Sequence, residues 1–147
     1  MIKFLDLGLQ PLANSYLKKK NLSQKEKKFK LEVAFNEKNY LVSIVNTVPK
    51  EKMFNNMYPY KSSESKTMRK SFKDLTTKIK KRFKPNFIIE IGSNDGVFLK
   101  NFTKKKIVGV EPCKNLAKLT SNINYTTYSE YWSSKLAKKL QEIKKPT

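Results

Sequence analysis

Residues 86–96 read NFIIEIGSNDG, a short apolar run that ends in a polar turn bounded by two glycines. The run is continuous rather than alternating, which is typical of a strand that is buried on both faces of a parallel sheet. Residues 97–103 are expected to begin a helix, and residues 107–110 read as a second buried strand. The order of these segments predicts a β-α-β unit. Further along the chain we expect helices over 115–121 and 131–143 and a third strand over 123–127.

A helix is expected before this unit. Apolar side chains between residues 68 and 83 recur at spacings of three and four, which predicts one apolar helical face. Ser63 or Ser65 is a candidate N-cap, and Lys84-Pro85 is expected to end the helix. The predicted face consists of Met68, Phe72, Leu75, Ile79 and Phe83.

The N-terminal third has a different pattern. Residues 29–35 alternate between apolar and polar side chains, and residues 40–45 read as a second strand after a polar turn, so a β-hairpin is predicted. Residues 1–17 contain Gly and Pro and are interpreted as a short turn-rich segment, followed by a lysine-rich loop over 18–28. The expected parts are an N-terminal module over 1–55, a connecting segment with its helix over 56–84, and an α/β part over 85–147.

Composition excludes several kinds of chemistry. The 147 residues include one cysteine, Cys113, and no histidine. The chain therefore has no intramolecular disulfide, no Ser-His-Asp triad and no Cys/His zinc site of its own, and Cys113 is interpreted as a small buried residue. No run is long enough to span a bilayer and the start lacks an apolar signal segment, so we expect a cytoplasmic protein with no membrane partner.

The net charge of +20 allows two interpretations. An acidic partner such as nucleic acid, an anionic membrane or a phosphorylated substrate would explain it. The alternative is a solvated lysine surface with no such partner. The lysines are scattered and only Arg69 and Arg82 are arginines, whereas proteins that read bases favour arginine forks. The pattern favours the solvated surface over nucleic-acid binding.

The turn after the first buried strand is the candidate site. Glu90, one spacer, Gly92, three residues and Gly96 make a pattern similar to the first motif of Rossmann-like methyltransferases. Gly92 allows a tight turn and the close approach of a ligand. Glu111 lies nineteen residues further on, at the position where an acidic side chain accepts hydrogen bonds from ribose hydroxyls in nucleotide-binding α/β folds. Three residues separate the two glycines, whereas the fingerprint of dinucleotide-binding folds has one residue between its first two glycines. An unrelated glycine-bounded turn is the alternative.

Residues 4–17 read FLDLGLQPLANSYL, which resembles the opening signature of the nucleotide-sugar C-methyltransferases. Residues 58–63 with Met68 resemble the segment before that family's first Rossmann strand, and residues 90–96 and 109–112 resemble its cofactor motifs. The similarity extends through nearly the whole chain, as far as residue 132. It implies a zinc-binding N-terminal module, a central Rossmann-like domain, S-adenosylmethionine as cofactor and a nucleotide-linked sugar as substrate.

The resemblance also implies a set of cofactor contacts. Gly92, Asn94 and Asp95 would line the methionine end, Glu111 would bind the ribose, and the segment with Tyr60 and Ser63 would close over the cofactor. Tyr60 as a packed aromatic, and Asn115 as a helix cap or a ligand contact, remain open alternatives. The full expected set is Tyr60, Ser63, Glu90, Gly92, Ser93, Asn94, Asp95, Gly96, Glu111 and Pro112, and no catalytic residue is assigned.

Two departures from the family modify these expectations. The family's zinc module carries a Cys-x-x-Cys in the hairpin turn, where this chain has Asn36-Glu37-Lys38-Asn39, so the zinc site is expected to be lost. The residues after Pro85 supply only two or three strands, so the chain is expected to be a small β-hairpin module followed by a truncated Rossmann-like domain. It would be active only with a second chain that supplies the remaining strands, or inactive. The alternatives are a non-catalytic basic protein that binds nucleic acid or another acidic partner, and an interaction module without chemistry.

Overall fold

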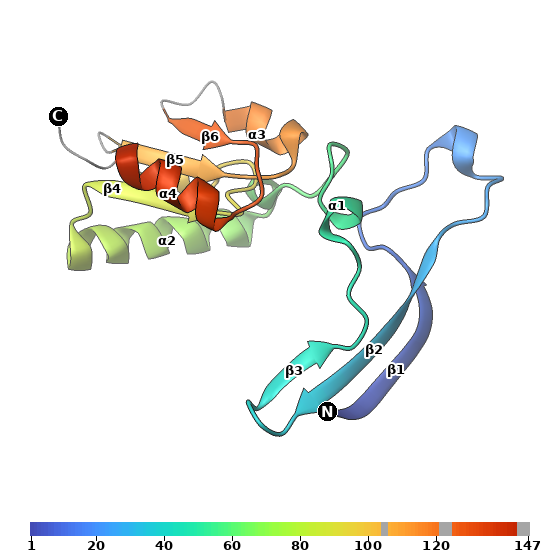
Figure 1. The fold of residues 1–147 in the computed structure, drawn as a ribbon. Coiled ribbons are helices and arrows are strands. Elements are labelled where there is room, and N and C mark those ends of the chain that lie inside the picture. The colour runs from blue at the N-terminus through green and yellow to red at the C-terminus, as the bar shows by residue number, and fades with distance from the viewer. Residues whose placement is uncertain (104–105, 121–124, 144–147) are drawn as a thin grey trace. The chain divides into compact units, whose positions relative to one another are not determined.

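The computed structural model describes residues 1–103, 106–120 and 125–143 (Figure 1). The chain divides into two compact units, Met1–Phe54 and Asn55–Thr147. The fold is mixed α/β, with a three-stranded antiparallel sheet in the first unit and a three-stranded parallel sheet in the second. No helix within the described ranges has the length and apolar character needed to cross a membrane.

The sheet of the first unit has the strand order β1-β2-β3. β2 (Lys28–Asn36) and β3 (Leu41–Ile44) form the predicted hairpin, and β1 (Ile2–Pro11) pairs antiparallel with the other edge of β2. A 3₁₀ turn at Lys19–Asn21 lies in the predicted lysine-rich loop, and a one-turn helix, α1 (Lys50–Met53), follows the hairpin after Pro49. Ala34 and Glu32 on β2 are the buried residues of this sheet, so its core is small.

The interpretation of residues 1–17 as a turn-rich segment is wrong for its first part, because β1 occupies ten of these residues. Gly8 does not end the strand. It adopts φ +66° inside an irregular stretch of the β1–β2 pairing, and its N–H donates to the Asp6 carboxylate over 2.8 Å. A glycine with positive φ can produce a bulge, which bends a strand and lets its pairing continue on the far side.

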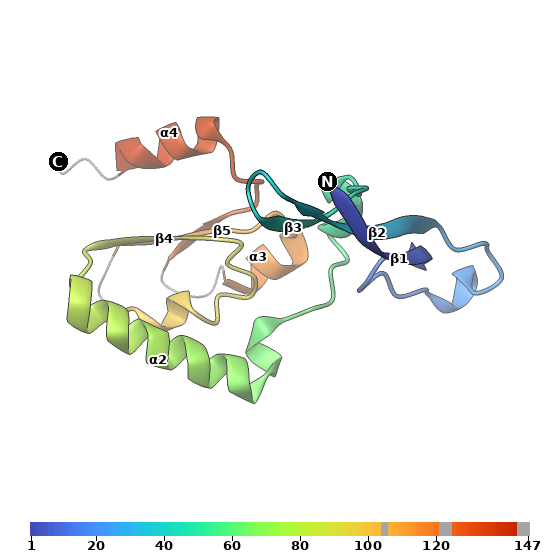
Figure 2. The same cartoon turned by 90° about the horizontal axis from the view of Figure 1, so that it is seen from below.

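The second unit has three parallel strands in the order β4 (Phe87–Ile91), β5 (Lys106–Val110) and β6 (Thr126–Tyr128). α2 (Lys66–Phe83) lies on one face of the sheet and α4 (Ser134–Ile143) lies on the other (Figure 2). α3 (Lys114–Thr120) connects β5 to β6. Two apolar clusters form its core: Val108, Val110, Leu136 and Leu140 on the α4 side, and Leu99, Phe102 and Ile107 with Ile79 of α2 on the opposite side.

α2 begins and ends as expected. The Ser65 hydroxyl accepts the Met68 N–H over 3.2 Å, which confirms the N-cap, and Lys84 ends the helix in the left-handed region at φ +43°. The predicted apolar face is only partly right. Leu75 is 44% exposed and Phe83 66% exposed, whereas Thr76 is buried. Thr76 can be buried because its hydroxyl donates to the Phe72 carbonyl within the helix.

Two further predictions need correction. The helix expected at 97–103 is only a 3₁₀ turn at Leu99–Asn101, because the Asn101 side chain donates to the carbonyls of Val97 and Phe98 over 2.9 and 3.1 Å. These carbonyls therefore bond a side chain, a local arrangement that competes with helix continuation. The predicted third strand starts later, at Thr126, and residues 123–124 together with residue 121 of the predicted helix lie outside the described residues.

Candidate functional site

The loop at residues 92–96 folds back over the carboxyl end of β5. The N–H groups of Gly92 and Ser93 both donate to the Val110 carbonyl, over 2.8 and 3.1 Å. Gly92, Asn94 and Gly96 all have positive φ, at +74°, +50° and +75°. The loop can make this reversal because glycine carries no Cβ and asparagine tolerates the left-handed region.

Glu111 joins the two loops that follow β4 and β5. It is buried, and its carboxylate accepts the Asn94 N–H over 2.8 Å and the Cys113 N–H over 2.9 Å. Each carboxylate oxygen thus receives one backbone hydrogen bond and keeps further acceptor capacity. Glu111 therefore fixes the position of Asn94, and half-buried Pro112 lies between the two residues that this carboxylate holds.

A strap formed by residues 58–63 is hydrogen-bonded to the loop. The Asn94 side chain accepts the Ser62 N–H over 2.9 Å and donates to the Tyr60 carbonyl over 3.2 Å. The Asp95 carboxylate accepts the Ser63 N–H over 3.3 Å. The structure therefore brings Tyr60 and Ser63 to the loop through their main chains, although they are about thirty residues away in sequence.

These contacts bear on two of the open alternatives. The Asn115 amide donates to the Tyr58 carbonyl over 2.7 Å, so Asn115 anchors the strap, while its Oδ1 has no partner among the described residues. The Tyr60 side chain is 45% exposed and is not a packed aromatic under α2. The anchoring role of Asn115 could not be predicted from the sequence, because its partner lies 57 positions away and no local pattern indicates that contact.

Three carboxylates gather around the loop: Glu90, Asp95 and Glu111. Burial, together with smaller contributions from the negative charges of Glu111 and Asp95, raises the pKa of Glu90 to about 8. Burial, with smaller contributions from Glu90 and Asp95, also raises the pKa of Tyr125 to about 12. These carboxylates form an acidic, partly desolvated cluster within a chain whose net charge is strongly positive.

Several buried polar atoms at this edge have no hydrogen-bond partner among the described residues. They are Glu90 Oε2, Ser93 Oγ, Asp95 Oδ1, Asn115 Oδ1 and Tyr125 Oη. Most buried polar atoms in folded proteins are paired, so a group of such atoms in one place indicates a ligand-binding site. Gly92 has open space where a Cβ would lie, with no atom within 4 Å.

Gly96 and Gly109 have packing roles. A Cβ on Gly96 would collide with the Tyr125 hydroxyl and lie 2.9 Å from Thr120 Cγ2. A Cβ on Gly109 would lie 2.8 Å from both Ser93 Oγ and Thr127 Oγ1. Sequence analysis assigned Gly96 to the cofactor and included Gly109 only within the motif at 109–112, although a glycine inside a strand is a signal of close approach.

Cys113 is buried, as expected, beside Glu111. Burial and the Glu111 charge raise the pKa of its thiol to about 12. Because the thiolate is the nucleophilic form, Cys113 is an inert packing residue.

The hairpin turn of the first unit is held by amide side chains where the resemblance implies cysteines. Asn36 Oδ1 accepts the Lys38 N–H over 3.0 Å, and Asn39 Oδ1 accepts the Leu41 N–H over 3.1 Å. The Asn36 carbonyl also accepts the Tyr40 N–H over 2.7 Å. No group of three His, Cys, Asp or Glu side chains suited to a metal occurs within the described ranges, and residues 1–54 contain neither Cys nor His. The donor set does not fit zinc.

Chelation is therefore expected to leave this module unchanged. Because the turn is closed by two side-chain-to-backbone hydrogen bonds, treatment with EDTA or a thiol-selective chelator should not alter its fold. The measurement is amide hydrogen exchange of β2 and β3 with and without chelator. Loss of protection after metal removal would contradict the prediction.

The buried carboxylate of Glu32 links β1, β2 and the segment after β3 in the first unit. Glu32 accepts hydrogen bonds from Lys3 Nζ over 3.0 Å, Lys30 Nζ over 2.8 Å and Asn46 Nδ2 over 2.8 Å. Hydrogen bonds from Lys30 and Lys3 lower its pKa to about 2. Since these donors come from β1, β2 and the segment after β3, Glu32 links the whole sheet.

Acid is expected to weaken this link. The pKa of Glu32 is 4.5 in the unfolded chain and about 2 in the folded one, so its contribution is complete above pH 4.5 and is lost as the pH falls to about 2. Hydrogen exchange of β2 amides, corrected for intrinsic rates, should show this loss in the natural chain. Glu32→Gln should lower protection at pH 7 and remove the acid step, whereas Glu37→Gln, at an exposed position of the same unit, should behave like the natural chain.

Comparison with known families agrees with the division into two units. Residues 1–54 match a family model described as "Putative zinc binding domain", whose name places it with methyltransferases. The first unit is therefore a methyltransferase-associated N-terminal module, and its link to methyltransferases predicted from sequence is confirmed at that level. No curated protein matches the chain.

Proposed function

We propose that the second unit binds S-adenosylmethionine at the carboxyl edge of its parallel sheet, as part of a Rossmann-like methyltransferase that C-methylates a nucleotide-linked sugar. The observation that carries the proposal is the gathering of Glu90, Asp95 and Glu111 around one loop of a chain with a net charge of +20. S-adenosylmethionine carries a sulfonium and an ammonium group, so a carboxylate-lined site suits it electrostatically.

The residues present fit this cofactor. Asp95 Oδ1 and Glu90 Oε2 are buried acceptors without partners, which an ammonium group could satisfy. Glu111 keeps acceptor capacity for ribose hydroxyls beyond the two backbone N–H groups it bonds. Gly92 has the open space that close approach requires, and the strap with Tyr60 and Ser63 is tied to this loop.

The cofactor supplies an activated methyl group when bound. The chain's own residues would bind and orient it, through the acidic cluster and the strap, and no residue is assigned as the base that C-methylation requires. We further propose that another chain completes the domain at β4. Within the described residues β4 pairs with β5 alone, and its Phe87 and Ile89 line a groove of about 490 Å³ with α4. An edge strand with one unpaired side accepts a further strand.

Titration calorimetry of the chain with S-adenosylmethionine tests the cofactor site. Micromolar binding is expected. Gly92→Ala should weaken it by about tenfold or more, a cost of at least about 1.4 kcal/mol, because a methyl group would enter the open space. Gly8→Ala is the matched control, since Gly8 also has positive φ and open space but lies in the other unit. No binding by a folded chain, or equal losses in both variants, would refute the assignment.

The charge of +20 favours a second candidate, a non-catalytic protein that binds nucleic acid or another polyanion. Binding of that kind weakens steeply with salt because counterions are released. A chain that binds single-stranded DNA with a steep salt dependence and does not bind S-adenosylmethionine would establish this candidate instead.

A further inference from the structure

One face of the sheet in the first unit carries two neighbouring rows of apolar side chains. In an antiparallel sheet, residues that lie opposite each other on adjacent strands point to the same face. The pairing register therefore gives one row of Ile2, Phe35 and Val42 and a second row of Leu5, Val33 and Ile44. These six residues form a continuous patch across β1, β2 and β3, which we call the apolar face.

The apolar face is open to solvent. Its four residues on β1 and β3 are between 43% and 61% exposed, and its two residues on the central strand β2 are half-buried. The apolar face of a sheet normally packs on another layer of secondary structure. A contiguous exposed patch of this kind marks a surface at which a protein binds a partner.

The charged side chains of this sheet lie on its opposite face. There, the Nζ atoms of Lys3 and Lys30 lie 3.0 and 2.8 Å from Glu32 Oε1. Ala34, which alternates with Val33 along β2, is fully buried on the same side. The polar face is therefore closed by its own side chains, whereas the apolar face lacks a covering layer.

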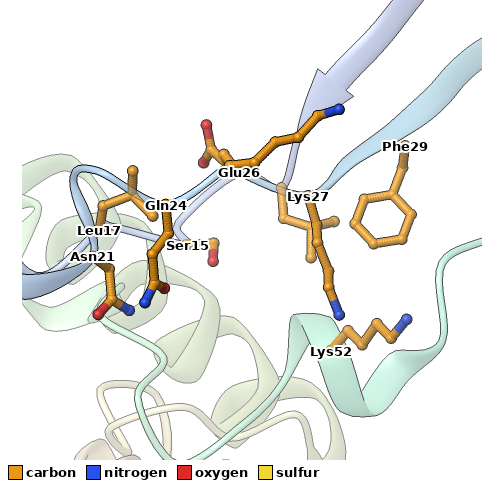
Figure 3. A pocket seen from close by; sticks show the side chains of 10 residues that line it. Ser15, Leu17, Asn21, Gln24, Glu26, Lys27, Phe29 and Lys52 are labelled. Atoms are coloured by element: carbon orange, nitrogen blue, oxygen red, sulfur yellow. The ribbon is translucent and has the colours of Figure 1, made fainter.

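The apolar side of the sheet is covered only at the start of β2. Phe29 lies on the same side as Val33 and Phe35, because side chains alternate along a strand. Its ring centroid lies 5.5 Å from Nζ of Lys52 on α1, and Figure 3 shows the two side chains at the pocket that both residues line. The open surface is thus limited to the two rows nearer the hairpin turn.

The size of the apolar face fits an interface between two copies of the chain. From the exposed fractions, its accessible surface is on the order of 500 Å², near the upper end of the largest apolar patch on a typical monomer. Two such faces packed together would bury about 1,000 Å², the lower limit for a specific interface. We therefore expect a reversible dimer that depends on concentration.

Charge also favours contact at this face. Each copy carries a net charge of +20, so two copies repel each other where their lysines meet. The six residues of the apolar face are uncharged, and sheets that pack face to face lie about 10 Å apart, close to one Debye length at 0.1 M salt. A purely apolar surface is complementary to itself, as a symmetric interface requires.

We propose that two copies of this chain form a symmetric dimer through their apolar faces, with the two sheets stacked as in a β-sandwich. Each copy contributes the same six residues, so each contact occurs twice. The inference goes beyond cofactor binding and does not rest on it, because the apolar face lies in the first unit and the acidic site in the second. It also uses a different surface from the completion of the second unit at β4.

Sedimentation velocity of the full chain tests the proposal, at concentrations from about 5 to 500 µM and at about 0.1 and 0.5 M sodium chloride. At the higher concentrations the natural chain should sediment with twice its mass of 17.2 kDa. The dimer should be tighter at the higher salt, because salt screens the repulsion between two copies. Association through a bound polyanion would weaken with salt instead.

Substitutions on β3 test which face makes the contact. Val42→Lys/Ile44→Lys brings like charges together from both copies and should raise the dissociation constant by about tenfold or more. Leu41→Lys/Ser43→Lys is the matched control, because it adds the same charge at exposed positions of the same strand that point to the opposite face. It should leave the dimer intact. Val42→Thr/Ile44→Thr keeps β-branched side chains and should also weaken the dimer, and circular dichroism melts check that all three variants fold.

Three results would overturn the proposal. The first is a natural chain that stays monomeric at the highest concentration in both salts, which would mean that another occupant covers the apolar face. The second is a dimer that withstands Val42→Lys/Ile44→Lys, such as one paired at β4, or that the matched control weakens equally. The third is a dimer that weakens with salt. Titration of the same variants with S-adenosylmethionine shows separately whether the second unit binds the cofactor.

Discussion

Gly96→Ala is expected to destabilise the second unit by about 3 kcal/mol more than Gly92→Ala does, because overpacking of a filled site adds to backbone strain. Both glycines have nearly the same backbone conformation, with φ of +75° and +74°. They differ in their surroundings: a Cβ on Gly96 meets the Tyr125 hydroxyl and Thr120, whereas one on Gly92 meets nothing within 4 Å. Comparing the two variants therefore separates the free-energy cost of the steric contact from the cost of placing alanine at a positive φ.

Urea unfolding followed by tryptophan fluorescence measures this difference. Trp132 is the chain's one tryptophan and lies in the second unit, so it reports on that unit. Gly92→Ala should cost only about 1–2 kcal/mol, the usual penalty for a side chain in the left-handed region. Equal unfolding free energies for the two variants would mean that Tyr125 does not pack under Gly96 as described.

Glu90→Gln is expected to stabilise the chain at pH 8.5 and to leave its stability nearly unchanged at pH 4.5. The folded pKa of Glu90, about 8, lies above its unfolded value of 4.5. Between these values the folded state keeps a proton that the unfolded state releases, so stability falls as the pH rises. This loss has an upper limit of about 5 kcal/mol. Glutamine stays neutral and removes it.

The same urea measurement at several pH values tests this prediction. The free energy of unfolding of the natural chain should fall between pH 5 and 8.5, and that of Glu90→Gln should stay flatter. Glu130→Gln is the control, because Glu130 is exposed and does not belong to the acidic cluster. A natural chain whose stability does not change over this range, or a Glu90→Gln chain that follows it, would show that Glu90 is not buried among Asp95 and Glu111.

If the cofactor site is occupied by a cation, Glu90 should ionise on binding. Tight binding at neutral pH would then release a proton, which calorimetry detects as a dependence of the binding enthalpy on the buffer. Glu90→Gln should lose this dependence. The environment of Glu90 beside Asp95 and Glu111 would thus determine both the pH dependence of stability without ligand and the release of a proton on cofactor binding.

Local patterns predicted most of the elements. The alternation of apolar residues identified β2, the three-and-four spacing identified α2, and the continuous apolar runs identified β4 and β5. Each of these signals depends on neighbours within one or two turns. The predictions failed where distant pairing overrides the local signal: β1 continues past Gly8 because β2 pairs with it on both sides of the bulge.

The same distinction applies to the candidate site, where local spacing predicted one part and contacts between distant residues decided the rest. The spacing of Glu90, Gly92 and Glu111 along the sequence placed these residues at the ends of two adjacent strands. It did not show that Asn94 and Asp95 would bond the strap, or that Asn115 would hold Tyr58. These contacts join residues 32 to 57 positions apart, and no periodicity in the chain encodes them.

The sequence by itself determined the strand and helix periods, the absence of Cys and His from residues 1–54 and the position of the acidic residues relative to the glycines. Only the tertiary structure decided that Glu90 lies half-buried beside two other carboxylates and that Gly96 must stay free of a side chain. Periodicity depends on backbone geometry and is local, whereas desolvation and close contact depend on which distant segments pack together.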